Sequence, residues 1–337
     1  MAKVKIGVLC PSEIAFRRCV PALKQSSDFE YVGVAVAEAG EWFGEPTTEQ
    51  VAAEHIKAQK FVDSYGGKIF KGYGELLNDP DVGSVYIPLP PALHYEWAKK
   101  ALLAGKHVLL EKPFCTNVKD TEELLHLAAA KHLAVHENYM FVYHSQLDWI
   151  KEHMPEIGEL RLIRIDFGFP FRGANDFRYN RELGGGALLD CGGYTLKLAG
   201  YFLGDSAKVT TSQLNMQPEF GVDIGGSATL TNAQGLTAQV AFGMDNSYRC
   251  NLEIWGSKGT LYTNRILTAP VGYEPQVILK IGDNEQTYTL PADDSFGKSI
   301  AYFGNCIDDE AERAKHYAEI RRQAELVAEI REKEQGK

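Results

Sequence analysis

Short apolar stretches alternate with amphipathic ones through the first 137 residues of the chain. Residues 4–9, 31–37 and 82–87 are apolar runs rich in β-branched residues, and such runs predict buried strands. The same reading predicts further strands at 68–70, 107–110 and 133–136, and helices at 14–24, from 48, at 94–104 and at 116–131. Strands that alternate with helices form a parallel, doubly wound sheet, so residues 1–137 are predicted to be a dinucleotide-binding Rossmann domain.

The pattern changes after residue 138. A helix at 146–154 and a long strand at 159–169 are followed by a glycine-rich helix at 186–203. Strand-like runs separated by turn residues then follow at 209–215, 227–231, 237–242, 249–255, 260–262, 277–281 and 287–290. A charged helix at 308–333 ends the pattern. Residues 138–337 are therefore predicted to be a second, α+β domain with a largely antiparallel sheet.

Composition limits the class of protein. The chain has 337 residues, 45% hydrophobic and 24% charged, which is ordinary for a two-domain globular protein. Its net charge of -10 argues against nucleic acid as a partner. The six cysteines are scattered without zinc-site spacing, so we expect no metal and a reduced, cytoplasmic compartment. No signal peptide and no apolar run of membrane-spanning length is expected.

The tripeptide Glu111-Lys112-Pro113 directly follows the strand predicted at 107–110. In an open α/β sheet, ligands bind at the carboxyl ends of the strands. Lys112 is therefore placed at the edge where a bound molecule would lie. The alternative is a strand-end lysine that faces only solvent.

The turn after the first strand reads CPSEIA over residues 10–15. A dinucleotide fingerprint reads G-x-G-x-x-G/A, so both early glycines are missing and only Ala15 fits. A helix N-terminus and the Ser12 hydroxyl remain to contact a phosphate, and a turn without a ligand is the alternative. Glu38 ends the second strand, where a carboxylate accepts from adenosine ribose hydroxyls and repels the extra phosphate of NADP, which favours NAD. An exposed loop glutamate is the alternative.

The stretch GGGALLDCGGY over residues 184–194 is the second informative motif. Asp190 and Tyr194 are four apart and are expected on one helix face. Gly192 and Gly193 each cost a helix about 1 kcal/mol relative to alanine, which suggests that a large group approaches the backbone there. A nicotinamide ring with its substrate is one such group, and close helix–strand packing around a buried tyrosine is the alternative.

These motifs together resemble the glucose–fructose oxidoreductase, inositol dehydrogenase and rhizopine catabolism family (Gfo/Idh/MocA), over essentially the whole chain. The matching stretches are YIPLP at 86–90, LHYEWA at 93–98, AGKHVLLEKPF at 104–114, NYMF at 138–141, YH at 143–144 and DFRY at 176–179, with GGGALLD at 184–190. Tyr194 stands where the family often has a histidine. That variant is similar to the branch of nucleotide-sugar 3-ketoreductases and dimeric dihydrodiol or xylose dehydrogenases.

The resemblance implies a Rossmann domain followed by a domain with an open-faced sheet. It also implies hydride transfer between a nicotinamide and a sugar hydroxyl or ketone carbon, with Tyr194 as the proton donor or acceptor. A free tyrosine has a pKa of about 10, and a nearby ammonium such as that of Lys112 favours the phenolate. Asp190 is expected to orient Lys112 or to bind a substrate hydroxyl.

The resemblance further implies a nicotinamide dinucleotide as cofactor, and Glu38 favours NAD, with NADP as the second possibility. The residues expected at the cofactor are Cys10, Ser12, Glu13, Ile14, Glu38, Pro88, Leu89, His94, Glu111 and Lys112. Those expected at the substrate are Asn138, His144 and Arg178.

The resemblance implies a small sugar or nucleotide-sugar molecule as partner, and a homodimer or homotetramer. Nucleic acid and a membrane are not expected as partners, because of the net charge and the short apolar runs. Two other functions stay open on the same fold. One is an NAD-binding regulatory or scaffold protein, which the missing glycines favour and the intact Lys112, Asp190 and Tyr194 oppose. The other is a sugar enzyme that uses NAD without net redox chemistry.

Overall fold

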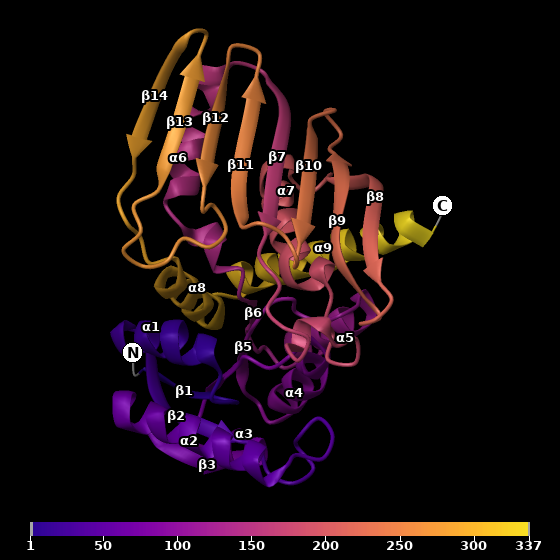
Figure 1. Ribbon diagram of the computed structural model, residues 1–337. Helices are drawn as coiled ribbons and strands as arrows, with labels where there is room; N and C mark the ends of the chain where they lie inside the picture. Colours follow the sequence, from indigo (N-terminus) through magenta and orange to yellow (C-terminus); the bar gives the residue numbers. More distant parts are fainter. Residues whose placement is uncertain (1–2, 336–337) are drawn as a thin grey trace. The chain divides into compact units, whose positions relative to one another are not determined.

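The computed structural model describes residues 3–335, which divide into two compact units (Figure 1). The first unit comprises residues 3–115, 119–138 and 296–320, and the second comprises 116–118, 139–295 and 321–335. The units are therefore interleaved along the chain. This differs from the simple division into 1–137 and 138–337, because residues 296–320 pack with the first unit.

The first unit is built on a six-stranded parallel sheet in the order β3-β2-β1-β4-β5-β6. Its strands are β1 (Val4–Val8), β2 (Phe29–Val36), β3 (Lys68–Lys71), β4 (Ser84–Ile87), β5 (His107–Leu110) and β6 (Val135–Glu137). The central strands are apolar because the sheet is covered on both faces, so that Val8, Val85 and Val108 are fully buried. The predicted doubly wound sheet is present.

Helices connect these strands. They are a π-helical turn η1 (Ala15–Cys19) continued by α1 (Val20–Gln25), then α2 (Thr48–Tyr65), α3 (Gly72–Asn78), α4 (Pro91–Leu103) and α5 (Val118–Ala130). Thr47 and Gln50 form a reciprocal capping box at the start of α2. Most of α8 (Ser295–Asp308) and the first part of α9 (Glu310–Gln335) also belong to this unit. Neither α3 nor α8 is predicted by the sequence pattern.

The second unit is built on an eight-stranded sheet in the order β14-β13-β12-β11-β7-β10-β9-β8. Its strands are β7 (Leu160–Gly168), β8 (Lys208–Gln217), β9 (Val222–Thr231), β10 (Thr237–Gly243), β11 (Arg249–Gly256), β12 (Gly259–Asn264), β13 (Gln276–Ile281) and β14 (Asn284–Thr289). Only β7 and β10 pair in parallel; the other pairs are antiparallel. The largely antiparallel sheet is as predicted.

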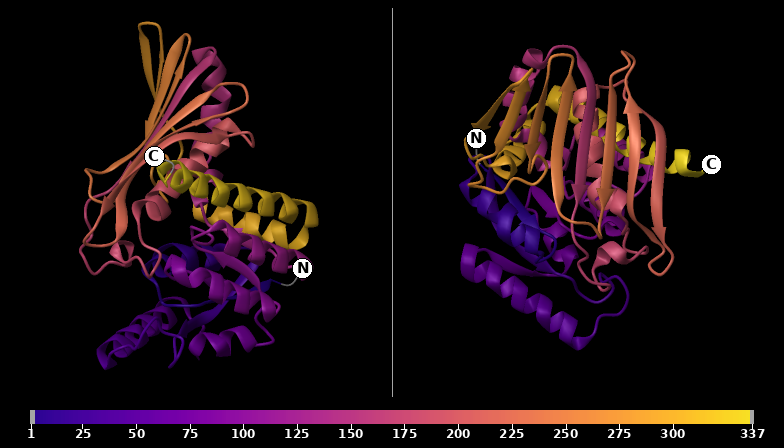
Figure 2. Two further views of the ribbon diagram at one scale, coloured as in Figure 1. Left: turned by 90° about the vertical axis from the view of Figure 1, so that its right-hand side faces the viewer. Right: turned by 45° about the horizontal axis from the view of Figure 1, so that its top comes forward.

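One face of this sheet packs on helices, and the other carries no helix of the described chain (Figure 2). The helical elements are η2 (Met140–Tyr143), α6 (Gln146–His153), η3 (Met154–Ile157), η4 (Phe177–Tyr179), the π-helical turn η5 (Leu188–Gly192) and α7 (Gly193–Leu203). Side chains alternate accordingly: Ile163 and Ile165 are buried under the helices, whereas Arg164 is exposed. Trp255, half exposed, also lies on an outward position of β11.

Membrane-spanning helices, metal-ligand clusters and disulfides are all absent from residues 3–335. No helix among them is both long and apolar enough to span a bilayer. No three His, Cys, Asp or Glu side chains among them gather as a metal site would require. All six cysteines are free thiols, and five of them are buried.

Candidate active site

The strand order of the first unit reverses between β1 and β4. From β1 the chain proceeds through β2 to β3 on one side, and β4 to β6 lie on the other. In open α/β sheets such a reversal leaves a crevice at the carboxyl ends of the strands, where ligands bind. The turns after β1, β4 and β5, which carry most of the expected cofactor residues, all lie at this edge.

The turn after β1 is held by side chains in place of glycines. Ser12 Oγ accepts the N–H of Ala15 at 3.2 Å, and the Ser12 carbonyl accepts the N–H of Phe16 at 3.0 Å. Cys10 Sγ donates to the Pro88 carbonyl at 3.6 Å, and burial raises the pKa of this thiol to about 12. The helix thus begins at Glu13, and the first N–H groups of a helix have no partner within it. A pyrophosphate fits this donor set, so the residues present suit a dinucleotide without the glycine fingerprint.

The turn after β5 carries Lys112, which is half buried, and a cis peptide bond joins it to Pro113. The preceding Glu111 carboxylate accepts the Tyr86 hydroxyl at 2.6 Å and the Asn138 amide at 2.7 Å. Asn138 in turn accepts the Ser299 hydroxyl at 2.9 Å. Burial and the Glu111 charge raise the pKa of Tyr86, which keeps it a hydrogen-bond donor. This chain of contacts fixes the residue before Lys112.

Asn138 is held by contacts within the protein. Its amide nitrogen donates to Glu111, its amide oxygen accepts from Ser299, and the side chain is almost completely buried. Both ends of the amide are engaged within the first unit. These contacts give Asn138 a part in positioning the Lys112 turn, and its contact with substrate stays a prediction.

His94 also makes its polar contacts within the protein. Its two ring nitrogens lie 2.7 Å from the carbonyl oxygens of Pro113 and Leu89, and the ring is fully buried. Burial lowers the pKa of His94 to about 4, so the ring is neutral and donates one proton. The contact of His94 with the cofactor stays a prediction, and the contacts within the protein are those of its ring nitrogens. His94 joins the turns after β4 and β5.

Tyr194 lies in the second unit, where a π-helical turn passes into α7. Its ring is almost completely buried and packs edge-on against Tyr139 and Phe167, with centroids 5.1 and 5.3 Å apart. Phe141 lies 5.8 Å away. Short π-helical segments often occur at functional sites because they shift one side chain out of the α-helical register. Here the turn includes Asp190 and ends two residues before Tyr194.

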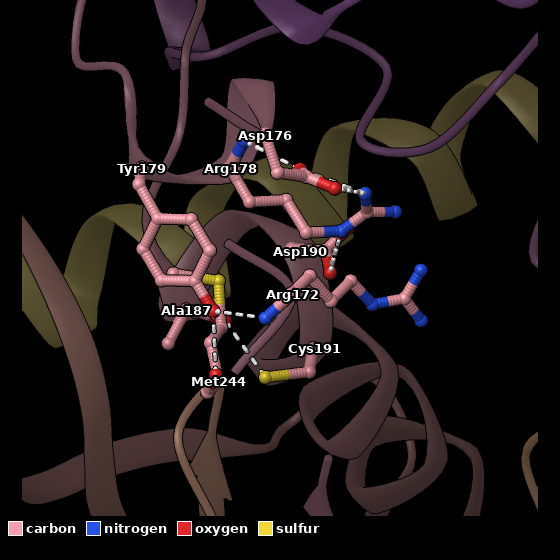
Figure 3. A network of polar contacts seen from close by, with 8 residues as sticks. All are labelled: Arg172, Asp176, Arg178, Tyr179, Ala187, Asp190, Cys191 and Met244. Carbon is pink, nitrogen blue, oxygen red and sulfur yellow. Dashed lines mark hydrogen bonds and ion pairs between the residues drawn. The ribbon is translucent and has the colours of Figure 1, made fainter. Parts of the chain in front are cut away.

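Arg178 links the loop before this helix to Asp190 (Figure 3). Its Nε donates to Asp190 Oδ2 at 2.7 Å, and its Nη1 donates to Asp176 Oδ1 at 3.1 Å. Burial alone would lower the pKa of Arg178, but the two carboxylates raise it, so the guanidinium stays charged. The same loop is fixed by Tyr179, which donates to the Met244 carbonyl at 2.6 Å. Arg178 therefore holds Asp190 in place.

The two glycines of the helix have a packing role. A Cβ on Gly193 would collide with the Tyr139 hydroxyl, and one on Gly192 would lie 3.2 Å from the Phe242 ring and from Leu188. Tyr139 and Phe242 are side chains of the same unit. The expectation that a ligand approaches this backbone is therefore unnecessary, and close packing around buried rings explains both glycines.

His144 likewise has a structural contact. It is buried, and its Nδ1 accepts the N–H of Gln146 at 3.1 Å at the start of α6. Asp293 Oδ2 lies 4.0 Å from the same nitrogen and accepts the N–H of Ser145 at 2.7 Å. The contact of His144 with substrate stays a prediction.

Sequence reasoning missed Asp223 on β9. Its carboxylate accepts the N–H of Leu188 at 2.6 Å and so caps the helix that carries Asp190 and Tyr194. Gly186 has φ +117, and a Cβ there would lie 2.5 Å from this carboxylate. Burial raises the pKa of Asp223. No local motif points to Asp223, because it lies 35 residues beyond the N–H that it caps.

A doubly wound parallel sheet with helix N-termini at its switch point, joined to a second sheet domain, is the architecture expected of a two-domain, dinucleotide-dependent oxidoreductase. The model of the oxidoreductase family with an NAD-binding Rossmann fold matches residues 20–139, and that of the Gfo/Idh/MocA C-terminal domain matches residues 154–262. The chain belongs to the Gfo/Idh/MocA family and is an NAD(P)-dependent oxidoreductase. The predicted family and enzyme class are confirmed.

Two similar proteins are dTDP-3,4-didehydro-2,6-dideoxy-alpha-D-glucose 3-reductases. That of Actinomadura kijaniata is 37% identical, covering 97% of this chain and 95% of its own length. That of Streptomyces violaceoruber is 36% identical, covering 98% and 95%. The crystal structure of the 3-ketoreductase KijD10 from A. kijaniata, in complex with NADP and TDP-benzene, superimposes with a TM-score of 0.90 at 36% identity over 98% of both chains. The predicted hydride transfer to a sugar carbon agrees with the activity named for these relatives.

An aldose–aldose oxidoreductase from Caulobacter crescentus shares the fold at 19% identity, with a TM-score of 0.85 over 99% of this chain and 98% of that one. At this identity the likeness concerns architecture alone. It shows that the pairing of a Rossmann domain with an open-faced sheet domain is common to enzymes of quite different sequence.

Proposed function

We propose that this protein is a reversible ketoreductase of a nucleoside-diphosphate-linked sugar, with Tyr194 exchanging the proton of the reacting hydroxyl and Lys112 stabilising charge on its oxygen. The observation that carries the proposal is the Lys112 turn, which the Glu111 contacts fix at the cofactor edge of the first sheet. The relatives' reaction on a dTDP-linked keto sugar supports the substrate class. A bound nicotinamide would supply or accept the hydride.

The chain's own residues then have distinct tasks. The turn at Ser12 and Glu13 binds the pyrophosphate through backbone N–H groups. Lys112 donates to the substrate oxygen as charge develops on it, which favours the transition state over the ground state. Tyr194 gives or takes the proton. Asp190, held by Arg178, accepts from a neighbouring hydroxyl of the sugar and fixes the reacting carbon.

An absorbance assay of nicotinamide oxidation tests this proposal with dTDP-linked keto sugars, free aldoses, polyols and diols. Lys112→Met and Tyr194→Phe are each expected to lower turnover at least about 100-fold while dinucleotide binding persists. Lys119→Met and Tyr201→Phe are the matched controls, because Lys119 is an exposed residue of α5 and Tyr201 lies beyond the site on α7.

Unchanged turnover of a true substrate by Lys112→Met contradicts the mechanism. The same assay separates the alternatives. A regulatory or scaffold protein binds dinucleotide but turns over none of the substrates. An enzyme without net redox chemistry converts its sugar while the absorbance of the reduced nicotinamide stays constant.

We also propose that the protein works as a homodimer or homotetramer in the cytoplasm. The open face of the second sheet supports this assembly, because it exposes half of Trp255 and contains a hollow of about 600 Å³ bordered by β7 to β11. The six free thiols support a reduced compartment. Sedimentation velocity tests the assembly. Trp255→Glu is expected to shift the protein towards monomer, whereas the exposed Phe43→Glu in the first unit is not.

A further inference from the structure

Three aromatic rings from two loops of the second unit pack together. Phe171 follows β7, Tyr179 lies in η4, and Phe220 lies in the turn between β8 and β9. The ring centroid of Tyr179 is 4.6 Å from that of Phe171 and 5.2 Å from that of Phe220. Tyr179 is buried, whereas Phe171 is 45% exposed. We call these three rings the aromatic platform, in which the buried tyrosine supports a phenylalanine that reaches solvent.

The backbone around the platform is fixed by hydrogen bonds. The Tyr179 hydroxyl donates to the Met244 carbonyl at 2.6 Å and accepts the N–H of Arg172 at 3.4 Å. The N–H of Phe220 donates to the Gln217 carbonyl at 3.2 Å and closes its turn. A surface that is already ordered loses little conformational freedom when a ligand covers it. The platform is therefore a preformed apolar surface, and aromatic rings bind planar heterocycles by stacking.

Arg172, the residue after Phe171, adds a positive charge next to the platform. It is exposed, and its guanidinium carbon lies 4.6 Å from the ring centroid of Phe169. Along residues 3–335 no ion pair joins Arg172 to a carboxylate, whereas Arg178 pairs with two. Figure 3 shows the side chains of both arginines extending to the same side. A guanidinium that is not neutralised by a carboxylate suits the oxygens of a phosphate.

The platform and the candidate reaction site are joined by one short turn. Arg178, whose Nε donates to Asp190 at 2.7 Å, directly precedes Tyr179 in η4. The carboxylates near the platform are bonded to Arg178, so Arg172 is left to a ligand. A flat apolar ring, a guanidinium and a carboxylate match the three parts of a sugar nucleotide, which are the base, the diphosphate and the sugar hydroxyls.

We propose that Phe171 and Arg172 form the subsite for the nucleoside diphosphate of the substrate. The ring of Phe171, supported by Tyr179 and Phe220, stacks on the base, and Arg172 binds the diphosphate. This inference rests on the proposed function for the class of substrate and adds the residues that distinguish a nucleotide-linked sugar from a free one.

Calorimetric titration of the purified full chain with dTDP, and separately with UDP, tests the subsite without turnover. Phe171→Ala should weaken binding at least about tenfold, and Phe171→Tyr, which keeps an aromatic ring, should bind nearly as tightly as wild type. Arg172→Ala should also weaken binding at least about tenfold and should make the remaining affinity less sensitive to salt.

Another exposed aromatic–arginine pair of the second unit supplies the controls. The guanidinium carbon of Arg265 lies 4.8 Å from the ring centroid of Tyr248, which is 44% exposed. Tyr248→Ala and Arg265→Ala should leave nucleotide binding unaltered. Thermal unfolding checks that each variant is folded, and Arg172→Ala still decides the matter if Phe171→Ala fails to fold.

The outcomes separate this inference from the proposed function. If wild type binds a nucleotide and Phe171→Ala and Arg172→Ala bind it equally well, the inference is wrong and the proposed function stands. An unchanged affinity in one of the two variants overturns the role given to that residue. If wild type binds neither nucleotide, the inference fails together with the nucleotide-linked substrate, and the absorbance assay with free sugars decides whether hydride transfer remains.

Discussion

The ligand-facing edge of the first unit and the glycine-rich segment of the second are built in opposite ways. At the edge, side chains of Ser12, Glu41 and His94 bond backbone groups, and the turn after β1 contains no glycine. In the segment before α7, glycine backbones pack directly against buried side chains such as Tyr139. Glycines thus mark close packing in the second unit, whereas polar side chains shape the turns of the first. We therefore expect removal of polar side-chain atoms or a change of pH in the first region to lower stability. In the second region, we expect added side-chain volume to lower it.

The largest effect is expected from acid. Folded His94 stays neutral down to about pH 4, whereas an unfolded histidine takes up its proton near 6.5. Between these values the unfolded state binds more protons, so stability falls as pH falls. Burial also lowers the pKa of His107 to about 4. His107 therefore lowers stability as the pH falls over the same range. His94 alone should contribute a loss of about 3 kcal/mol at pH 4.

Urea unfolding across this pH range measures the effect. The slope of the unfolding free energy against pH reports how many more protons the unfolded state binds than the folded state. His94→Gln should reduce this difference by about one proton. His126→Gln, at an exposed position on α5, is the control and should keep the wild-type slope. An unchanged slope in His94→Gln would mean that the edge is not held by a neutral histidine.

Added volume in the second region should have the next largest effect. Gly193→Ala places a methyl group against the Tyr139 hydroxyl and should lower the unfolding free energy by about 1–3 kcal/mol. Gly200→Ala on the same helix meets only Leu326 at 3.5 Å, and should be neutral or stabilise by up to about 1 kcal/mol. Thermal unfolding measures both.

A second-site change sharpens this test. Tyr139→Phe removes the colliding hydroxyl, so Gly193→Ala should cost less in that background than in wild type. Equal costs in the two backgrounds would show that the glycine is present for some reason other than this contact.

The smallest effect is expected at the turn after β1. Ser12→Ala removes the acceptor for the Ala15 N–H and should cost about 1 kcal/mol, whereas Ser12→Gly should cost only a few tenths. Ser64→Ala, at an exposed position of α2, is the control and should change stability by less than about 0.5 kcal/mol. The comparison fails if Ser12→Ala is as stable as wild type.

The sequence predicts those elements that are specified by residues close together in the chain. The strand at 107–110 and the turn bearing Lys112 are apparent because apolar periodicity and a following proline are visible in a short window. By contrast, α3 is short and begins at a glycine, and its N–H groups are capped by Glu41 from a separate loop. The helix α8 does have a local amphipathic pattern, with Phe296, Ile300 and Phe303 buried, but Gly304 within it weakens the helix signal. Phe303 stacks on Phe29.

The same distinction holds for the site. Lys112 follows from strand and turn signals, and Asp190 and Tyr194 follow from a motif. The partners of Asn138 and His94, however, depend on chain segments brought together by folding, Ser299 and Pro113 among them. No pattern in a single stretch shows that these polar side chains are already engaged.

Because the two units are interleaved along the chain, a single cut does not separate them into independent fragments. A fragment that stops at residue 138 would keep every strand of the first sheet but lack Ser299 and Phe303, which belong to the same unit. Asn138 would lose a partner, and Phe29 would be exposed to solvent. A stand-alone cofactor-binding fragment must therefore have residues 296–320 spliced back on, for example behind a short flexible linker.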